Sequence, residues 1–272
     1  MIKITFCVQG VISPLLANVY LHYVYDLWVQ QWRKRHARGA VIVVRYADDT
    51  IVGFQFEDDA RSFLDSLRER LAAFALDLHA EKTRLIAFGR FAQVNPRRHG
   101  TGRGETFDFL GFTHICAKSR NGRFLLRRQS MRKRLRAKLA EIKEELRRRR
   151  HQGIAEQGQW LKSVVAGYFA YHAVPTNGRT LSAFRYHVIQ TWLRSLRRRS
   201  QRHNMPWDRM NRIIDAWIPP VVLSHPWPNQ RFDVRHPRQE PSAECGAGGY
   251  VAFRAEGGRQ RRVTAFERHI TK

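Results

Sequence analysis

The chain has few cysteines, few acidic residues and no long apolar run, and each shortage excludes a class of protein. Its three cysteines, Cys7, Cys116 and Cys245, stand far apart without a Cys-x-x-Cys pair. This spacing argues against a disulfide framework and against a cysteine-ligated zinc site. A reducing, cytoplasmic setting is therefore expected. No apolar stretch approaches the roughly 18 residues of a membrane-spanning helix and no signal peptide is evident, so no membrane partner is expected.

The charge balance of the chain favours a polyanion as its partner. Among 272 residues, 49 Lys and Arg stand against 23 Asp and Glu, which gives a formal net charge of +26. An excess this large is typical of proteins that bind nucleic acid. Hydrophobic residues still make up 43% of the chain, enough to fill a core. The length suits one large or two modest domains.

Residues 41–54 predict a tight hairpin with two adjacent carboxylates at its tip. Apolar, largely β-branched runs at 41–44 and 51–54 flank a short polar break that holds Asp48 and Asp49. Adjacent carboxylates repel each other unless a cation or hydrogen bonds compensate, and hard oxygen ligands of this kind suit Mg²⁺. The alternative is that aspartate is simply a common turn residue, and for an isolated Asp-Asp pair that alternative is favoured.

The flanking residues add to the metal interpretation. Residues 45–49 read Arg-Tyr-Ala-Asp-Asp and resemble the Tyr-Ala-Asp-Asp catalytic hairpin of reverse transcriptases. The resemblance implies an RNA-directed DNA polymerase that uses dNTPs, with Asp48 and Asp49 as catalytic Mg²⁺ ligands and Tyr46 beside the nucleotide. Residues 10–21 resemble the segment that precedes this hairpin in group II intron reverse transcriptases. In that family, a loop that binds the nucleotide and the template precedes this segment. The resemblance implies that the loop includes Gln9 and Gly10 here, although the family has a glycine where Gln9 stands.

Two further motifs follow in the order of that family. Residues 81–83 (Glu-Lys-Thr) resemble a segment beside the active site, which implies that Lys82 assists the leaving pyrophosphate. The alternative is an ordinary solvated lysine. Residues 107–112 read alone as core β structure, but they resemble the primer-gripping hairpin. The primer-grip residues implied by this resemblance are Phe109, Leu110 and Gly111.

Hydrophobic periodicity predicts the remaining elements. Helices are expected at about 11–38 and from 57 onward, a strand near 81–88, and a hairpin with a type I′ turn at Asn121–Gly122. From Ser130, expected as a helix N-cap, the pattern changes to long helices, at about 130–150, 157–173, 179–200 and 207–217. We therefore predict an α+β fold, a partial reverse-transcriptase palm of antiparallel sheet and helices followed by an all-helical thumb and maturase region.

The helical half is strongly basic. A charged helix face is usually only solvated surface, but a face that is almost uniformly positive favours contact with phosphates. Arginines interleaved with aromatic residues suit single-stranded or looped RNA. Most of the aromatic residues Tyr168, Tyr171, Phe184 and Trp192 are nevertheless expected in the helical core. The candidate RNA-binding residues are Arg132, Lys133, Arg134, Arg136, Arg194, Arg197, Arg198 and Arg199.

Three regions are expected from these patterns. Residues 1–128 would form the partial palm, 129–240 the RNA-binding thumb and maturase region, and 241–272, rich in glycine and arginine, a disordered tail. Residues 167–201 resemble the thumb and maturase region of bacterial group II intron proteins. The resemblance implies intron maturase activity besides DNA synthesis, with group II intron RNA and a DNA primer or target as partners.

One expected ligand is missing from the sequence. The family supplies a further metal-binding carboxylate ahead of these motifs, yet no Asp or Glu precedes Asp26 in this chain. We therefore expect a fragment that lacks the fingers, that synthesises little DNA by itself, and that would need an N-terminal fragment in trans. The alternatives are a non-catalytic RNA-binding splicing cofactor and an inactive remnant of the element.

Overall fold

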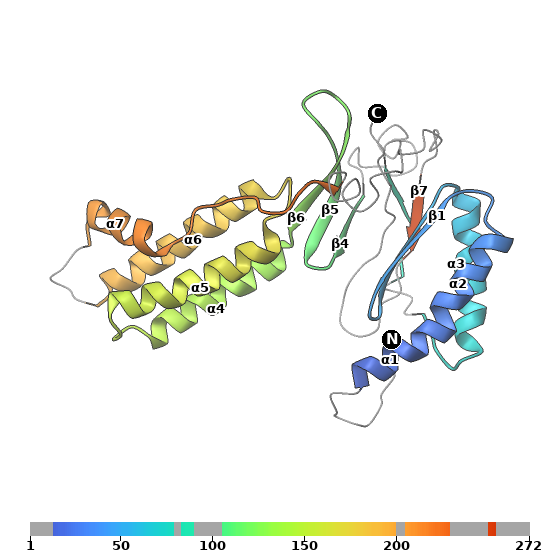
Figure 1. Ribbon diagram of the computed structural model, residues 1–272, viewed down its shortest axis with the longest axis horizontal. Coiled ribbons are helices and arrows are strands. Elements are labelled where there is room, and N and C mark those ends of the chain that lie inside the picture. Colours follow the sequence, from blue (N-terminus) through green and yellow to red (C-terminus); the bar gives the residue numbers. More distant parts are fainter. Residues whose placement is uncertain (1–12, 79–82, 90–104, 200–204, 229–249, 254–272) are drawn as a thin grey trace. The chain divides into compact units, whose positions relative to one another are not determined.

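The computed structural model describes residues 13–78, 83–89, 105–199, 205–228 and 250–253 (Figure 1). They belong to two compact units, the first holding 13–110, 114–126 and 250–253, and the second holding 111–113 and 127–228. The predicted α+β class is confirmed, because small antiparallel sheets with helices are followed by a helical region. In those ranges, no helix combines the length and the apolar character needed to cross a membrane.

The first unit begins with one long helix that contains an irregular turn. Helix α1 (Ser13–Leu21) passes through the π-helical turn η1 (His22–Asp26) into α2 (Leu27–Arg35). The predicted helix is therefore present, but the π turn was not foreseen. A π turn places one extra residue within the helical ladder and is often found at functional sites.

A four-stranded sheet carries the predicted hairpin. Strands β1 (Val41–Tyr46) and β2 (Asp49–Phe54) pair antiparallel along their whole length. The sheet continues through β7 (Tyr250–Phe253) to β3 (Ile86–Phe88) in the order β1-β2-β7-β3. Strand β2 is buried on both faces, because Ile51 and Val52 enter two different hydrophobic clusters. The hairpin is thus held by the most buried strand of the unit.

Strand β7 lies within the segment 241–272, for which the sequence predicted disorder. Its residues, Tyr-Val-Ala-Phe, include three that favour strands, and they pair antiparallel with both β2 and β3. A prediction from the composition of the whole segment missed this short run, because the surrounding residues are rich in glycine and arginine. The structure describes these four residues as a strand; the rest of the segment lies outside the described residues, so the expectation of a disordered tail stays a prediction.

Helix α3 (Glu57–Ala72) covers the sheet and also holds the loop that leads into β1. Phe63, Leu67 and Leu71 are buried. The carboxylate of Asp59, only 4% exposed, accepts hydrogen bonds from the backbone N–H groups of Arg38 (3.0 Å) and Gly39 (3.1 Å). An acidic residue in the first turn of this helix therefore positions the chain just before the hairpin.

Strands β4 (Thr106–Phe109), β5 (Phe112–Lys118) and β6 (Phe124–Ser130) form a second sheet in that order. The loop between β5 and β6 differs from the predicted type I′ turn, because Gly122 has a positive φ (71°) and Asn121 does not. The Gly122 N–H donates to the Ser119 carbonyl (3.0 Å), so the turn is centred one residue earlier. This is the three-residue hairpin loop that ends in a left-handed glycine.

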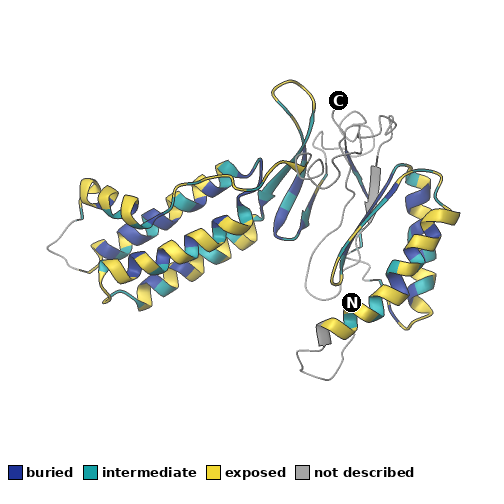
Figure 2. Ribbon diagram, viewed as in Figure 1, coloured by how far each residue is buried: buried dark blue, intermediate teal, exposed yellow. Residues whose placement is uncertain are grey.

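The second unit consists mainly of four helices around one apolar core (Figure 2). They are α4 (Arg132–Arg148), α5 (Ile154–His172), α6 (Gly178–Arg197) and α7 (Trp207–Trp217). Phe184 and Trp192 are fully buried, as predicted, whereas Tyr171 is half exposed. The buried Gln157 accepts from the Trp192 indole N–H (2.9 Å) and donates to the Arg149 carbonyl, so both of these buried polar side chains are hydrogen-bonded.

Ser130 does not cap α4, and that prediction is wrong. Met131 is the N-cap residue, without a side-chain hydrogen bond, while Ser130 is buried at the end of β6. The Asn177 amide accepts from the Ser130 N–H (3.0 Å) and donates to the Ser130 hydroxyl (2.9 Å) and to the His172 carbonyl (2.8 Å). Three hydrogen bonds from one buried asparagine therefore tie β6 to the connection between α5 and α6.

Candidate active site and RNA-binding surface

The tip of the β1–β2 hairpin is a two-residue turn made by Ala47 and Asp48. Tyr46 and Asp49 form the last strand pair before it. Ala47 has a positive φ of 53°, and Asp48 does not, which is the pattern of a type II′ turn, where glycine is preferred. A left-handed alanine costs roughly 1–2 kcal/mol. Such strain persists where the surrounding structure enforces it and is common at functional sites.

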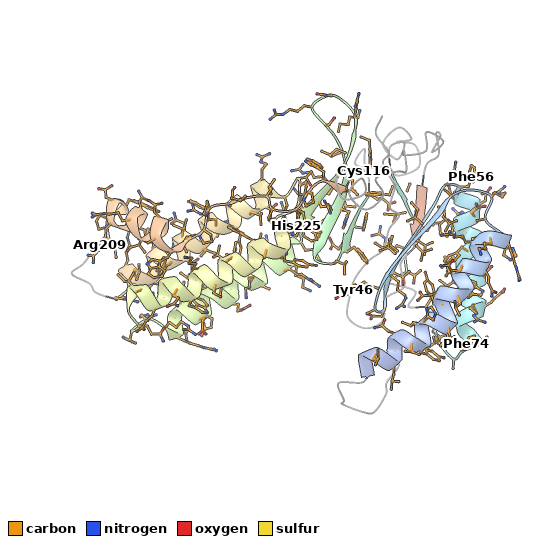
Figure 3. The ribbon with its side chains drawn as sticks, in the orientation of Figure 1. Tyr46, Phe56, Phe74, Cys116, Arg209 and His225 are labelled. Atoms are coloured by element: carbon orange, nitrogen blue, oxygen red, sulfur yellow. The ribbon has the colours of Figure 1, made fainter. Side chains whose placement is uncertain are left out.

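Both predicted carboxylates stand at this tip. Asp48 is exposed, and Asp49 is half-buried as the first residue of β2. The Tyr46 side chain is 63% exposed and lies at the same tip (Figure 3). Mg²⁺ is usually held by one or two carboxylates together with substrate phosphates. Among the described residues, no cluster of three or more His, Cys, Asp or Glu could hold a metal. The two aspartates therefore fit a Mg²⁺ site in which they are the protein ligands and substrate phosphates supply the other ligands.

Arg45 anchors the turn to the long helix. Its guanidinium donates to both carboxylate oxygens of Asp26, at 2.7 and 2.6 Å. It also donates to Asn18 Oδ1 (2.9 Å) and to the carbonyl of Ala47 (2.8 Å). The hydrogen bond to Asp26 raises the pKa of Arg45, so this side chain stays charged. One guanidinium thus joins the strained turn residue to α1 and to the π turn.

Asp26 is a positioning residue that the sequence did not reveal. Helical periodicity cannot show a π turn, so nothing in the sequence indicates that Asp26 meets the hairpin. In the structure its carboxylate also lies 3.4 Å from Nδ1 of His22. Beside this ion pair is a cavity of about 370 Å³, whose lining residues are His22, Asp26, Val29, Gln30, Arg33, Val43 and Arg45. The hairpin therefore has a polar hollow at its base, within the first unit.

Replacing Arg45 by Lys is expected to lower the free energy of unfolding of the first unit by about 1.5–3 kcal/mol, the usual range for hydrogen bonds to charged groups. A lysine ammonium cannot reproduce the two-pronged contact with Asp26. Urea denaturation combined with amide hydrogen exchange of β1 and β2 measures the change. Arg33→Lys, at an exposed arginine that lines the same cavity, is the control and should change stability by less than about 0.5 kcal/mol. Equal stability of the two variants would contradict the anchoring role.

The structure describes only some of the other residues that the sequence assigned to the polymerase site. Gln9, Gly10 and Lys82 lie outside the described residues. Leu110 (φ 46°) and Gly111 (φ 83°) form the two-residue turn between β4 and β5, where both central residues are left-handed. A Cβ at Gly111 would lie 3.0 Å from a guanidinium nitrogen of Arg134. Phe109 is buried in the core of the first unit, so of these three residues only Leu110 is partly exposed.

The predicted RNA-binding residues are all exposed, but two of them are engaged within the protein. Arg132, Lys133, Arg134 and Arg136 extend from the first turns of α4, and Arg194 and Arg198 lie at the end of α6. Arg197 donates to the carbonyl of Met205 (3.0 Å), and Arg199 donates to that of Gln152 (2.7 Å). Burial lowers the pKa of Arg199. Sequence reasoning also missed Tyr186, whose side chain is 58% exposed on α6.

Comparison with known proteins gives a match for the part of the chain that contains the hairpin. Residues 5–114 match the model of a family described as reverse transcriptase (RNA-dependent DNA polymerase). The matched range contains the whole β1–β2 hairpin with Asp48 and Asp49, and also Asp26 and Arg45. No curated protein matches the chain. Residues 5–114 are therefore similar to the reverse transcriptase family, and helices α4 to α7 lie beyond that similarity.

Proposed function

We propose that this chain is part of an RNA-directed DNA polymerase of the group II intron type that also binds intron RNA as a maturase. The observation that carries the proposal is the pair of adjacent carboxylates at a strained two-residue hairpin, within the segment that matches reverse transcriptases. The proposed substrates are dNTPs, a DNA primer or target, and an RNA template. The proposed setting is the cytoplasm.

The proposed roles of the residues rest on the resemblance to reverse transcriptases, supported by the positions of those residues that the structure describes. Asp48 and Asp49 would hold Mg²⁺, which when bound neutralises phosphate charge and orients the reacting groups. Arg45 and Asp26 keep the turn in place, and the exposed Tyr46 ring lies where it can border the nucleotide. Lys82 is proposed to donate a proton to the leaving pyrophosphate. Electrostatic stabilisation and positioning supply most of the catalysis in phosphoryl-transfer reactions of this kind.

A second candidate function is an RNA-binding splicing cofactor without DNA synthesis. The exposed basic side chains of α4 and α6 favour it, because they require nothing from the hairpin. An inactive remnant of the element is the third alternative. The three alternatives differ in two measurable properties, which are RNA binding and Mg²⁺-dependent primer extension.

The chain is expected to bind RNA with an affinity that falls steeply with salt, because each neutralised phosphate releases counterions. If the predicted RNA-binding residues other than Arg197 and Arg199, six in number, each contact a phosphate, the slope of log K against log salt should be about −4 for single-stranded RNA. Extension of a DNA primer on an RNA template with Mg²⁺ is then assayed for the chain alone and with the N-terminal segment of a related reverse transcriptase in trans.

Extension in either assay supports the polymerase, and chelation of Mg²⁺ by EDTA should abolish it. Salt-dependent RNA binding without extension in both assays would favour the cofactor. If the chain neither binds RNA nor extends a primer, the results would favour the inactive remnant.

A further inference from the structure

Strands β2 and β3 of the first unit run in the same direction, with one strand position between them. Both pair antiparallel with β7, which fills that position. The connection from β2 to β3 contains α3 and passes over the position without filling it, as crossovers between parallel strands do. The strand that fills the position, here called the β2–β3 slot, comes instead from the far end of the described chain (Figure 1).

The backbone of β7 is divided between its two neighbours. The N–H of Ala87 on β3 donates to the Glu105 carboxylate (3.1 Å), on the side away from β7. In an antiparallel pair, opposite residues alternate between exchanging both hydrogen bonds and exchanging neither. Val251, which stands opposite Ala87 on β3 and opposite Phe54 on β2, therefore directs its N–H and C=O toward β2. A proline at position 251 would remove a hydrogen bond between β7 and β2.

Few contacts hold β7 in the slot. It has four residues and pairs with three residues of β2 and three of β3, whereas β1, on the other side of β2, pairs with all six. Strands usually have about five or six residues. The sequence on both sides of β7 contains the glycines Gly246, Gly248, Gly249, Gly257 and Gly258. Because glycine loses more conformational freedom on ordering than other residues do, β7 can leave the slot at low cost.

The slot is apolar on both faces of the sheet. Ile51 and Ile86 belong to one hydrophobic cluster, and Val52 and Phe54 belong to the other. A strand that is buried on both faces has a nearly continuous apolar run. The residues of β7, Tyr-Val-Ala-Phe, supply four apolar residues before the run ends at Arg254. A longer apolar run would therefore fit the slot better than β7 does.

We propose that the β2–β3 slot is a strand-exchange site, which accepts an extended apolar segment of another polypeptide in place of β7. The segment that fits has about six apolar residues without proline and pairs antiparallel with β2 and β3. Main-chain hydrogen bonds supply the affinity in this mode of recognition, and side chains supply the specificity. Strand β7 is the competitor that fills the slot when no partner is present. This interaction is with protein, and it does not depend on the proposed polymerase activity.

The test is fluorescence anisotropy of the full chain with a fluorescein-labelled peptide that has the sequence of residues 248–255. Val251→Pro in the chain should empty the slot, and the peptide should bind this variant about tenfold more tightly than it binds the unaltered chain. The factor follows because a tethered strand competes at an effective concentration of about 1 mM, about ten times an expected peptide Kd of about 0.1 mM. Val251→Ile keeps the N–H and a β-branched side chain, so this matched control should bind the peptide as the unaltered chain does.

Two changes in the peptide test the chemistry of the slot. Arg254→Val extends the apolar run and should strengthen binding by at least about tenfold, the order of effect of burying one valine side chain. Val251→Pro in the peptide should abolish binding, because it removes the N–H that meets β2. Amide hydrogen exchange of the Val251→Pro chain should show that the peptide restores protection to Val52 and Phe54, which are paired with β7 in the structure.

Equal affinity of the peptide for the unaltered and Val251→Pro chains, or binding that leaves β2 unprotected, would overturn the strand-exchange site. If the Val251→Pro chain does not fold, a peptide with photoreactive benzoylphenylalanine at position 253 is added in excess to the unaltered chain. Cross-links to β2 or β3 would then support the site, and cross-links confined to the helical unit, or none, would overturn it. None of these measurements uses RNA binding or primer extension, so the proposed function can fail while the strand-exchange site stands.

Discussion

Replacing Asp48 by Asn should reduce primer extension by more than about a hundredfold. Loss of a residue that only supports a metal ligand already lowers metal affinity or activity by about 10- to 100-fold. Asp48 is proposed as a ligand itself, so its loss should have a larger effect. The substitution keeps the size of the side chain and removes only its charge. Because Asp48 is exposed at the turn, folding and RNA binding should be unaffected. Extension by a chain supplied with an upstream segment in trans, measured under single-turnover conditions with Mg²⁺, tests the expectation.

Asp65→Asn provides the control for this experiment. Asp65 is 71% exposed on α3 and pairs with Arg68, three residues away, so the substitution removes one surface charge from the same unit. Extension that is lost equally in both variants would indicate a general electrostatic effect. Primer extension that is unchanged in Asp48→Asn would show that Asp48 is not a catalytic residue, and it would contradict the proposal that the hairpin binds a metal.

Asn177→Ala is expected to lower the free energy of unfolding of the helical unit by about 3 kcal/mol or more. The substitution leaves the Ser130 N–H and the Ser130 hydroxyl without the partner they have in the structure, and it removes one of two donors from the His172 carbonyl, which keeps the Val174 N–H (2.8 Å). Each buried polar group left unpaired costs about 1–3 kcal/mol, and Asn177 itself is 0% exposed. Urea denaturation followed by far-ultraviolet circular dichroism, which is dominated by the helices, measures the loss.

Asn211→Ala is the matched substitution at an exposed position of α7, and it should change stability by no more than about 0.5 kcal/mol. A loss at Asn177 no larger than at Asn211 would mean that water replaces the amide without cost. The network would then have no structural role. Ser130→Ala should recover part of the loss in a double variant, because it removes one of the groups left unpaired.

The parts of the fold that sequence reasoning predicted are those governed by local periodicity. The hairpin at 41–54 is present where two apolar, largely β-branched runs indicated it, and the helix at Trp207–Trp217 where a 3.6-residue repeat did. The placement of Asp48 and Asp49 at the tip also followed from the strand pattern alone. Their proposed role, in contrast, came from resemblance, because two adjacent aspartates have an ordinary explanation in any turn.

The features that were missed depend on contacts between distant residues. Ser130 has the chemistry of an N-cap, but the amide of Asn177, 47 residues away, binds it instead. Asp26 gains its role only through Arg45, 19 residues later. None of these outcomes can be read from spacing within one element.

The π turn between α1 and α2 has a consequence for insertions and deletions. The five residues His22–Asp26 span nearly the same rotation as four residues of α-helix, because the π ladder joins residues five apart and not four. If all five residues adopted α geometry, one side of the helix would rotate by about 100° relative to the other. Val29 and Trp32, 2% and 4% exposed, could then not face the core while Asn18 still met Arg45. Deletion of one residue from this turn should therefore be tolerated, because the α geometry that results would keep both sets of contacts.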